Sequence, residues 1–400
     1  MSNWLNAGFL NHTTALIAGL LLFGSVTNSA NARIIRVGPM HSIHTIFEAS
    51  LLVASGDTVE VDAGSYVGDV ATWRQSNLTL RAVGGRVRLI ANGASEGGKG
   101  IWVVRGENFT VDGFDFIGAK VKDRNGAGIR FEKGSLTVRN CSFTNNENGI
   151  LTGNDSTLSL TIENSEFGFN GHGDGFSHNL YVGEIARLSV AGSYFHHAKR
   201  GHLLKTRAAF NQITANRLTD EDGGTASYEL EFPNGGVAYV VGNIIQQSRT
   251  TENQLLISFG AEGYRYPKNE LYLVNNTMVN PLSTGGSFLR VRAGAQRVLV
   301  INNLLVGDGA ASLLDGAHLN GNYAIQFDAF RDMSDTDLNL LDLSQLMGKG
   351  IEPGVIDGVS LRQETEYSHP TSTMPVYSKA LIPGAFQNPS YRPRRNSGQR

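Results

Sequence analysis

The sequence predicts an all-β solenoid of about ten coils, because a strand-like repeat has the period of one coil. A phrase consisting of an apolar strand, a polar or glycine corner and a second apolar pair recurs between residues 110 and 306. The corner residues are 23 to 33 residues apart, at Gly113, Asn140, Asn164, Gly192, Ala215, Gly242, Asn275 and Asn302. The paired asparagines at 275–276 and 302–303 are expected to stack from coil to coil and to bond the backbone there.

Composition supports a large packed core. The chain has 400 residues with 40% hydrophobic content, and its 48 glycines against 10 prolines fit many tight corners. The net charge of −2 provides no basic excess, so no nucleic-acid partner is expected. The single cysteine, Cys141, has no partner for an internal disulfide and is expected to be a buried, unreactive member of the repeat.

The N-terminus resembles an export signal. The apolar run 15–26 is followed by Asn28-Ser-Ala-Asn-Ala32, a small-residue cleavage pattern, although His12 is the only basic group before it. We predict a signal peptide over residues 1–32, a mature start at Arg33, and a periplasmic or extracellular location. The run is short for a bilayer span, so no stable membrane anchor is expected after cleavage.

A capping helix is expected before the first coil. Within residues 42–55, Ile43, Ile46, Phe47 and Leu51 have helical spacing. The dipeptide Gly56-Asp57 is expected to end the helix. The open end of a strand stack needs a cover, because exposed strand edges promote aggregation. Coiling is expected to start at Thr58.

The segment after this helix reads Ala54-Ser-Gly-Asp-Thr-Val-Glu-Val-Asp-Ala-Gly-Ser-Tyr66. This segment, together with the asparagine-rich corners up to about residue 306, resembles the pectate-lyase-like right-handed parallel β-helix proteins. The resemblance implies a right-handed parallel β-helix domain with an N-terminal cap over residues 33–326. It identifies a fold rather than a reaction, since that fold hosts lyases, hydrolases, epimerases and inert tailspikes.

The repeat fades after residue 306. Residues 327–365 have a helix-like pattern of Leu and Asp, and residues 366–400 are rich in Pro, Ser and Arg. We expect residues 327–400 to form a covering segment followed by a flexible tail, without a second domain.

Each coil has a further strand whose alternation defines an outward face. Ile129, Ile150, Leu180, Leu204 and Leu230 are expected to point inward. The outward residues are then Arg130, Leu151, Tyr181, Lys205 and Glu231, on rungs about 4.8 Å apart. Further polar candidates around this strip are His178, Asn179, Arg200, His202, Arg207 and Glu229. This concentration of titratable groups on three coils makes the strip the predicted site.

The strip suits β-elimination from a uronic-acid polysaccharide, in which a cation neutralises the carboxylate and a base removes the C5 proton. Lys205 is the candidate base if Arg207 and partial burial favour its neutral amine. Arg207 or Arg200 would clamp the carboxylate, and Tyr181 or His178 would protonate the departing oxygen. Lyases of the resembled fold often use Lys or Arg as the base, with or without calcium. Arg130 and Asn179 are candidate substrate contacts.

Other functions stay open. The same groups would serve a C5-epimerase, and the strip could also bind an acidic polysaccharide without chemistry. Inverting hydrolysis would use Glu229 and Glu231, roughly 6.6 Å apart on one strand face, at the lower edge of the ~6.5–9.5 Å range for inversion. It ranks below elimination, because the motifs of β-helix polygalacturonases are missing apart from Gly171-His-Gly173.

Simpler interpretations apply to several of these residues. Lys205 and Glu231 could form an ordinary cross-strand ion pair, and His178 and His202 could be structural corner histidines. The loop 220–225, with three acidic residues, could hold Ca²⁺ or be a solvated turn. No cofactor is otherwise implied, and the oligomeric state is left open.

Overall fold

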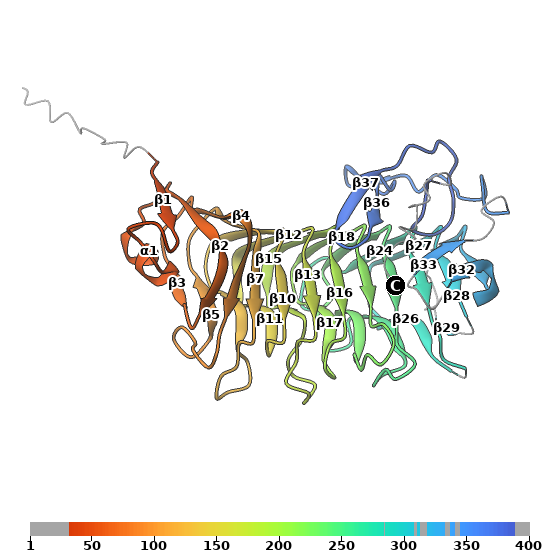
Figure 1. The fold of residues 1–400 in the computed structure, drawn as a ribbon. Coiled ribbons are helices and arrows are strands. Elements are labelled where there is room, and N and C mark those ends of the chain that lie inside the picture. Colours follow the sequence, from red (N-terminus) through yellow and green to blue (C-terminus); the bar gives the residue numbers. More distant parts are fainter. Residues whose placement is uncertain are drawn as a thin grey trace, which may run out of the picture. The chain divides into compact units, whose positions relative to one another are not determined.

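The computed structural model describes residues 32–283, 285–307, 310–312, 318–332, 337–340 and 345–388. All but the last residue of the predicted signal segment 1–32 lies outside these ranges. The described chain winds as a parallel β-solenoid in which each coil contributes three strands (Figure 1). A first strand runs to a corner, a second strand follows the corner, and a third strand completes the coil. No helix within the described ranges is long and apolar enough to cross a membrane.

The first and second strands together form a 21-stranded sheet within the described residues. Its first strands, including the two long strands that turn the corner without a break, are β1 (Ile34–Val37), β2 (Thr58–Val67), β4 (Thr79–Ile90), β6 (Phe109–Asp112), β9 (Ser135–Arg139), β12 (Asp155–Glu163), β15 (Ile185–Ala191), β18 (Phe210–Thr214), β21 (Val237–Val241), β24 (Glu270–Val274), β27 (Arg297–Ile301) and β30 (His318–Asn320). Its second strands are β7 (Phe114–Ile117), β10 (Ser142–Thr144), β13 (Glu166–Gly168), β16 (Tyr194–His196), β19 (Arg217–Thr219), β22 (Ile244–Gln246), β25 (Thr277–Val279), β28 (Leu304–Val306) and β31 (Tyr323–Ile325).

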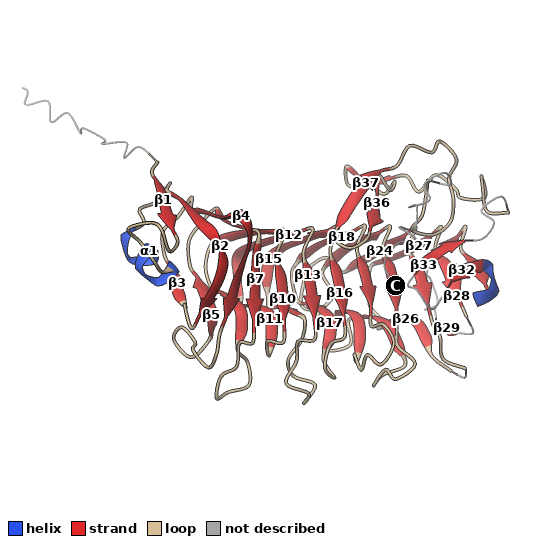
Figure 2. Ribbon diagram, in the orientation of Figure 1, coloured by secondary structure: helices blue, strands red, loops and turns tan. Residues whose placement is uncertain are grey.

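The third strands form a separate parallel sheet, which has ten strands within the described residues. They are β3 (Ala71–Trp73), β5 (Gly100–Val104), β8 (Ala127–Phe131), β11 (Asn148–Thr152), β14 (Leu180–Val182), β17 (His202–Thr206), β20 (Tyr228–Phe232), β23 (Leu255–Phe259), β26 (Ser287–Val291) and β29 (Ala310–Ser312). Figure 2 shows that strands dominate the described chain.

The predicted corner residues are the points where the backbone turns. Asn140, Asn164, Ala215, Asn275 and Asn302 have φ between 49° and 55°, and the glycines at the other three corners also have positive φ. Asparagine and glycine adopt this left-handed conformation at low cost, which explains why they recur at this position. The repeat predicted from the sequence is therefore confirmed at its corners.

The residue after each of the later corners belongs to an asparagine ladder, which is buried at Asn216, Asn243, Asn276 and Asn303 and half-buried at Asn322. Asn243 Nδ2 donates to Asn276 Oδ1 at 3.0 Å and to the Ile213 carbonyl at 2.8 Å. Asn243 Oδ1 accepts from the Asn216 backbone N–H and from Asn216 Nδ2. Each buried amide thus has its hydrogen bonds satisfied by neighbouring coils, which burial requires.

The interior is filled by inward residues stacked from coil to coil. The rings of Phe116, Phe143, Phe167 and Phe195 stack nearly parallel, with centroids 4.7 to 4.9 Å apart. Cys141 is 2% exposed, as expected from its place in the repeat, and burial raises the pKa of its thiol to about 12. Such continuous packing lets each coil bury an apolar surface that it could not bury alone.

The N-terminal end has the expected helix, α1 (Ile46–Leu52), which begins with a Thr45–Glu48 capping box. Two details differ from prediction. The helix buries Ile46 and Ala49, whereas Phe47 and Leu51 are exposed. Coiling begins before the helix rather than after it, because β1 pairs in parallel with β2.

The C-terminal part differs from the helical pattern predicted for residues 327–365. Its described elements are the 3₁₀ turn η1 (Phe327–Ala329) and the short antiparallel pairs β32 (Phe330–Asp332) with β33 (Asp337–Leu340), β34 (Val355–Ile356) with β35 (Val359–Ser360), and β36 (Thr365–Ser368) with β37 (Ser372–Pro375). The β36–β37 hairpin lies beside the coils (Figure 1).

Residues up to 388 pack closely rather than forming a loose tail. Ile382 and Ala385 are buried against Ile244, Val279 and Leu304. The amide of Asn275 donates to the Ile382 carbonyl at 2.8 Å. The remaining part of the predicted tail, residues 389–400, lies outside the described ranges.

Candidate functional site

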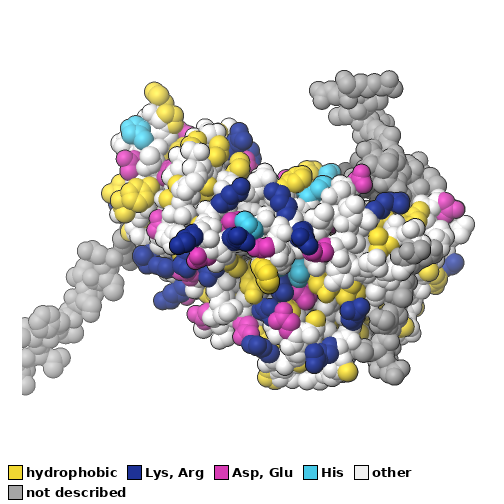
Figure 3. Space-filling model, turned by 90° about the horizontal axis from the view of Figure 1, so that it is seen from below, with side chains coloured by type: hydrophobic (Ala, Val, Ile, Leu, Met, Phe, Trp, Pro, Cys, Tyr) yellow, Lys and Arg dark blue, Asp and Glu magenta, His cyan; other side chains and the backbone are white. Residues whose placement is uncertain are grey.

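The outward residues of the ten-stranded sheet form one row. The pairing register joins Leu151 to Tyr181, Tyr181 to Lys205, and Lys205 to Glu231. Arg130 precedes Leu151, and Ser258 and Arg290 follow Glu231. This is the register expected from alternation, and we call these side chains the row. Figure 3 shows basic, acidic and histidine side chains gathered over the middle of the face seen from below Figure 1.

Lys205 lies between two carboxylates. Its Nζ is 3.0 Å from Glu231 Oε2 and 3.5 Å from Glu262 Oε1, and the side chain is 13% exposed. The alternative interpretation of Lys205 and Glu231 as a cross-strand ion pair is therefore realised. Burial would raise the pKa of Glu231, but His202 and Lys205 outweigh it and lower that pKa. The ion pair thus lies on the outward face of the ten-stranded sheet.

Arg207, just after β17, is held by three groups. Its Nη1 and Nη2 donate to Glu262 at 2.6 and 2.9 Å, its Nε donates to the Tyr181 hydroxyl at 3.0 Å, and Nη1 also bonds the Asn234 side chain. Burial lowers the pKa of Arg207, but these hydrogen bonds prevail and raise it. The guanidinium predicted to clamp a substrate carboxylate therefore already clamps a carboxylate of the protein.

The two histidines support the row from behind. His178 Nδ1 accepts the backbone N–H of His202 at 2.9 Å, and its ring stacks against Tyr181. His202 Nε2 lies 2.8 Å from Glu231 Oε2. Burial and nearby positive charges lower the pKa of His178 well below its usual value. A neutral His178 whose Nδ1 accepts a hydrogen bond carries its proton on Nε2.

Glu229 does not share the face of Glu231, contrary to the prediction. It lies at the level of Leu203 and Leu256 on the neighbouring coils, both in the hydrophobic core, and is 0% exposed. The matching glycines show why: a Cβ on Gly128 would be 2.8 Å from the Phe143 ring inside the solenoid. The strand bends here, so two consecutive side chains point inward, and the two glutamates do not form an outward pair for inverting hydrolysis.

Of the three remaining candidates, Asn179 and Arg200 lie away from the row. Asn179 is fully buried and bonds Asn170 and the His196 carbonyl, so it serves a corner rather than the row. Arg200 is bonded to Glu252 through its Nε at 3.0 Å. Arg130 is in the row, two rungs from Tyr181, with its Nε 3.5 Å from Glu132.

The acidic loop at 220–225 does not present converging carboxylates. Asp220 is buried and accepts the Ala226 N–H at 2.6 Å. Glu221 is bonded to Tyr194 at 2.8 Å and to Arg217 at 3.2 Å. Among the residues that the structure describes, no group of three or more His, Cys, Asp or Glu side chains could hold a metal ion.

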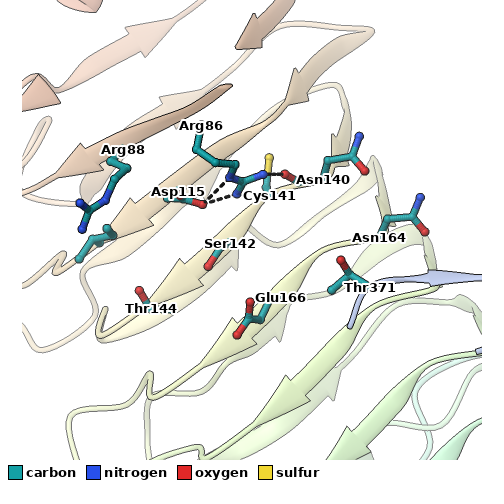
Figure 4. A pocket seen from close by; sticks show the side chains of 11 residues that line it. Arg86, Arg88, Asp115, Asn140, Cys141, Ser142, Thr144, Asn164, Glu166 and Thr371 are labelled. Carbon is teal, nitrogen blue, oxygen red and sulfur yellow. Dashed lines mark hydrogen bonds and ion pairs between the residues drawn. The ribbon is translucent and has the colours of Figure 1, made fainter. Parts of the chain in front are cut away.

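Two cavities lie on the face made by the second strands. One, of 380 Å³, is lined by Asp115, Ser142 and Glu166 on neighbouring coils, and its Arg86 is bonded to Asp115 and to the Asn140 carbonyl (Figure 4). The other, of 790 Å³, is lined by Tyr194 and Glu221 among others. The described lining of these cavities includes no lysine, whereas the row combines lysine, arginine and tyrosine.

Sequence reasoning missed Glu262 and Asn234. Both lie in loops that follow third strands, and Glu262 is 55 residues from Arg207 in the chain. The period of the repeat predicts contacts between strands, but loop lengths differ from coil to coil, so loop contacts have no signal in the pattern. The hint that the sequence offers for the Arg207–Glu262 contact is a carboxylate in a loop one or two coils after the arginine.

Neither a protein-family model nor a curated protein matches the chain by sequence. Among solved structures, pectate lyase Pel9A is similar with a TM-score of 0.51 and 15% identity, covering 89% of this chain and 96% of that chain. A pectin methylesterase has a TM-score of 0.34 and 10% identity over 72% and 92% of the two chains. A PL6 family alginate lyase, AlyGC, has a TM-score of 0.31 and 15% identity over 82% and 59%. The likeness to Pel9A shows the shared parallel β-helix fold. The other two similarities are too weak to add to this conclusion.

Proposed function

We propose that this protein is a carbohydrate-active enzyme that cleaves a uronic-acid-containing polysaccharide by β-elimination. The observation that carries the proposal is the row itself. Tyr181, Lys205 and Glu231 occupy consecutive rungs, with Arg207 bonded to Tyr181 at their edge. The similarity to pectate lyase Pel9A gives this fold a precedent for an acidic polysaccharide substrate.

The reaction needs a base, a cation and an acid on one side of the sugar. In the proposed step Lys205 first passes its ammonium proton to Glu231 and then, as the neutral amine, takes the C5 proton of the uronate. The C5–H electron pair forms the C4–C5 double bond, the C4–O bond breaks, and the departing oxygen takes a proton from the Tyr181 hydroxyl. A positive charge near the uronate carboxylate stabilises the negative charge that develops there, and Arg207 supplies it.

Several contacts support these roles. The Tyr181 oxygen accepts the Nε–H of Arg207, so the hydroxyl proton of Tyr181 remains available for donation. Glu231 contacts both Lys205 and His202, which gives a proton on the lysine a path away from the row. His178 stacks on Tyr181 and holds its ring in place.

The test is absorbance near 235 nm, where the unsaturated uronate product absorbs, with pectate, alginate, glucuronan and glycosaminoglycans as substrates, with and without calcium. We expect a rise with one of them, and a loss of at least about 10²-fold in Lys205→Ala, the typical size of general acid–base catalysis. Arg81→Ala, which changes an exposed arginine of β4 in the other sheet, is the control and should retain the wild-type rate. A flat trace, or a Lys205→Ala rate equal to wild type, would contradict the proposal. Proton exchange at C5 without absorbance would indicate an epimerase instead.

A further inference from the structure

Glu262 occupies the space between Lys205 of the row and Arg207 at its edge. Its Oε1 lies 2.9 Å from Arg207 Nη2 and 3.5 Å from Lys205 Nζ, while its Oε2 lies 2.6 Å from Arg207 Nη1. A planar, two-pronged contact of this kind is how arginine recognises any carboxylate. The site is therefore built for a carboxylate and is already filled by one.

We propose that Glu262 is a built-in substitute for the substrate carboxylate, so that a uronate enters the row by displacing this side chain from Arg207 and Lys205. The inference rests on the proposed function for the identity of the substrate. In this proposal Glu262 is a gating residue, which sets the affinity for the substrate without taking part in the chemical step.

The loop around Glu262 is built so that the side chain can leave while the backbone stays. The Glu262 N–H donates to the Pro233 carbonyl at 2.9 Å, and the flanking Gly260 and Gly263 N–H groups are also bonded. The side chain is 46% exposed, whereas Arg207 is 15% exposed. Rotation of the Glu262 side chain thus moves the carboxylate into water, and the half-buried guanidinium of Arg207 remains in place to receive the incoming carboxylate.

The exchange replaces one carboxylate by another, so its net cost is small. Arg207 keeps its contacts to Tyr181 and Asn234 when Glu262 leaves, and these two residues hold the guanidinium in its orientation. Lys205 keeps its contact to Glu231. A substrate without a carboxylate cannot compensate for the lost ion pairs, so the same residue would discriminate against neutral sugars.

The test measures binding of sodium glucuronate to the full chain by saturation-transfer NMR, with glucose as the neutral probe. Glu262→Gln should lower the Kd for glucuronate about fivefold, the factor that one partly exposed charged pair provides. Glucose binding should not change. Glu262→Asp, which keeps the charge on a shorter side chain, should lie between wild type and Glu262→Gln.

Glu252→Gln is the matched control, because Glu252 pairs with the exposed Arg200 outside the row. Its Kd for glucuronate should equal that of wild type. An unchanged or higher Kd in Glu262→Gln and Glu262→Asp would overturn the inference. The readout does not depend on turnover: tighter glucuronate binding without any 235 nm product would uphold Glu262 as the gate and refute β-elimination.

Discussion

Glu229 is a carboxyl group in a position that neighbouring coils fill with leucine. Both of its oxygens are buried without a hydrogen-bond partner. Burial, and then the charge of Asp220, raise the pKa of Glu229 well above its usual value. Burial likewise raises the pKa of Asp220 to about 8. Both shifts favour the protonated form of the carboxyl in the folded protein, because an unpaired buried charge is costly.

These carboxyls make folding stability depend on pH. Their folded pKa values lie above the unfolded values near 4, so the folded state binds more protons between the two. The stability they contribute is complete below about pH 4 and is lost as pH rises towards the folded value of about 8 for Asp220.

We predict that Glu229→Leu stabilises the protein by about 1–3 kcal/mol at pH 7, since it removes a buried carboxyl without a partner. The gain in denaturant unfolding should be larger at pH 8 than at pH 5. Glu107→Leu, at an exposed position, should change stability by less than about 0.5 kcal/mol. A lower stability of Glu229→Leu at every pH would show that the carboxyl has a favourable partner.

The placement of single residues was predictable only where alternation held. Tyr181, Lys205 and Glu231 lie in one row because each is flanked on both sides by buried, inward residues. Glu229 and Asn179 have the same parity as the row, yet they point inward where the strand bends. The clue was present in Gly128 and Gly149, whose missing side chains make room for Phe143 and Phe167, but the sequence does not reveal which side of the strand needs that room.

At the scale of elements, the corners explain why asparagine recurs. One residue takes the positive φ, and the next forms the buried ladder. At the N-terminal end, the helix α1 and the strand β2 after it were predictable from their spacing, whereas β1 was not. The buried face of α1 was not predictable either, because it depends on which surface of β1 and β3 the helix contacts.

Asn243→Ala should destabilise the protein by about 3 kcal/mol or more, since it leaves several buried donors and acceptors unpaired at once. Thermal and denaturant unfolding measure the loss. Asn154→Ala is the comparison, because Asn154 is exposed and accepts one hydrogen bond, from the Glu184 N–H. Equal losses in the two variants would mean that the ladder adds nothing beyond an ordinary surface bond.

For the whole molecule, the C-terminal segment acts as a cover for the later coils. Ile382, Ala385 and Tyr367 bury part of the apolar surface of β22, β25 and β28. Asn302 bonds both the N–H and the carbonyl of Ile351. The helical pattern predicted for this segment failed in the described part: Leu346 and Leu361 are buried in two separate clusters against the solenoid rather than along one helical stripe.

Deletion of residues 345–400 should uncover this surface. We expect a lower melting temperature than that of the full chain and association that increases with concentration, since large exposed apolar patches promote it. Light scattering after gel filtration and thermal unfolding measure both. A chain that ends at Asn388 keeps these contacts and should behave as the full chain; the same behaviour in the longer deletion would refute the covering role.

The asparagine ladder also gives the solenoid an electrical direction. The side-chain carbonyls of Asn243, Asn276, Asn303 and Asn322 each accept from the preceding coil, so their oxygens all face the N-terminal end. Aligned amide dipoles add, as they do in a helix, and hydrogen bonds in series polarise one another. A charged group placed beside one end of this column would therefore experience the opposite field from the same group placed beside the other end.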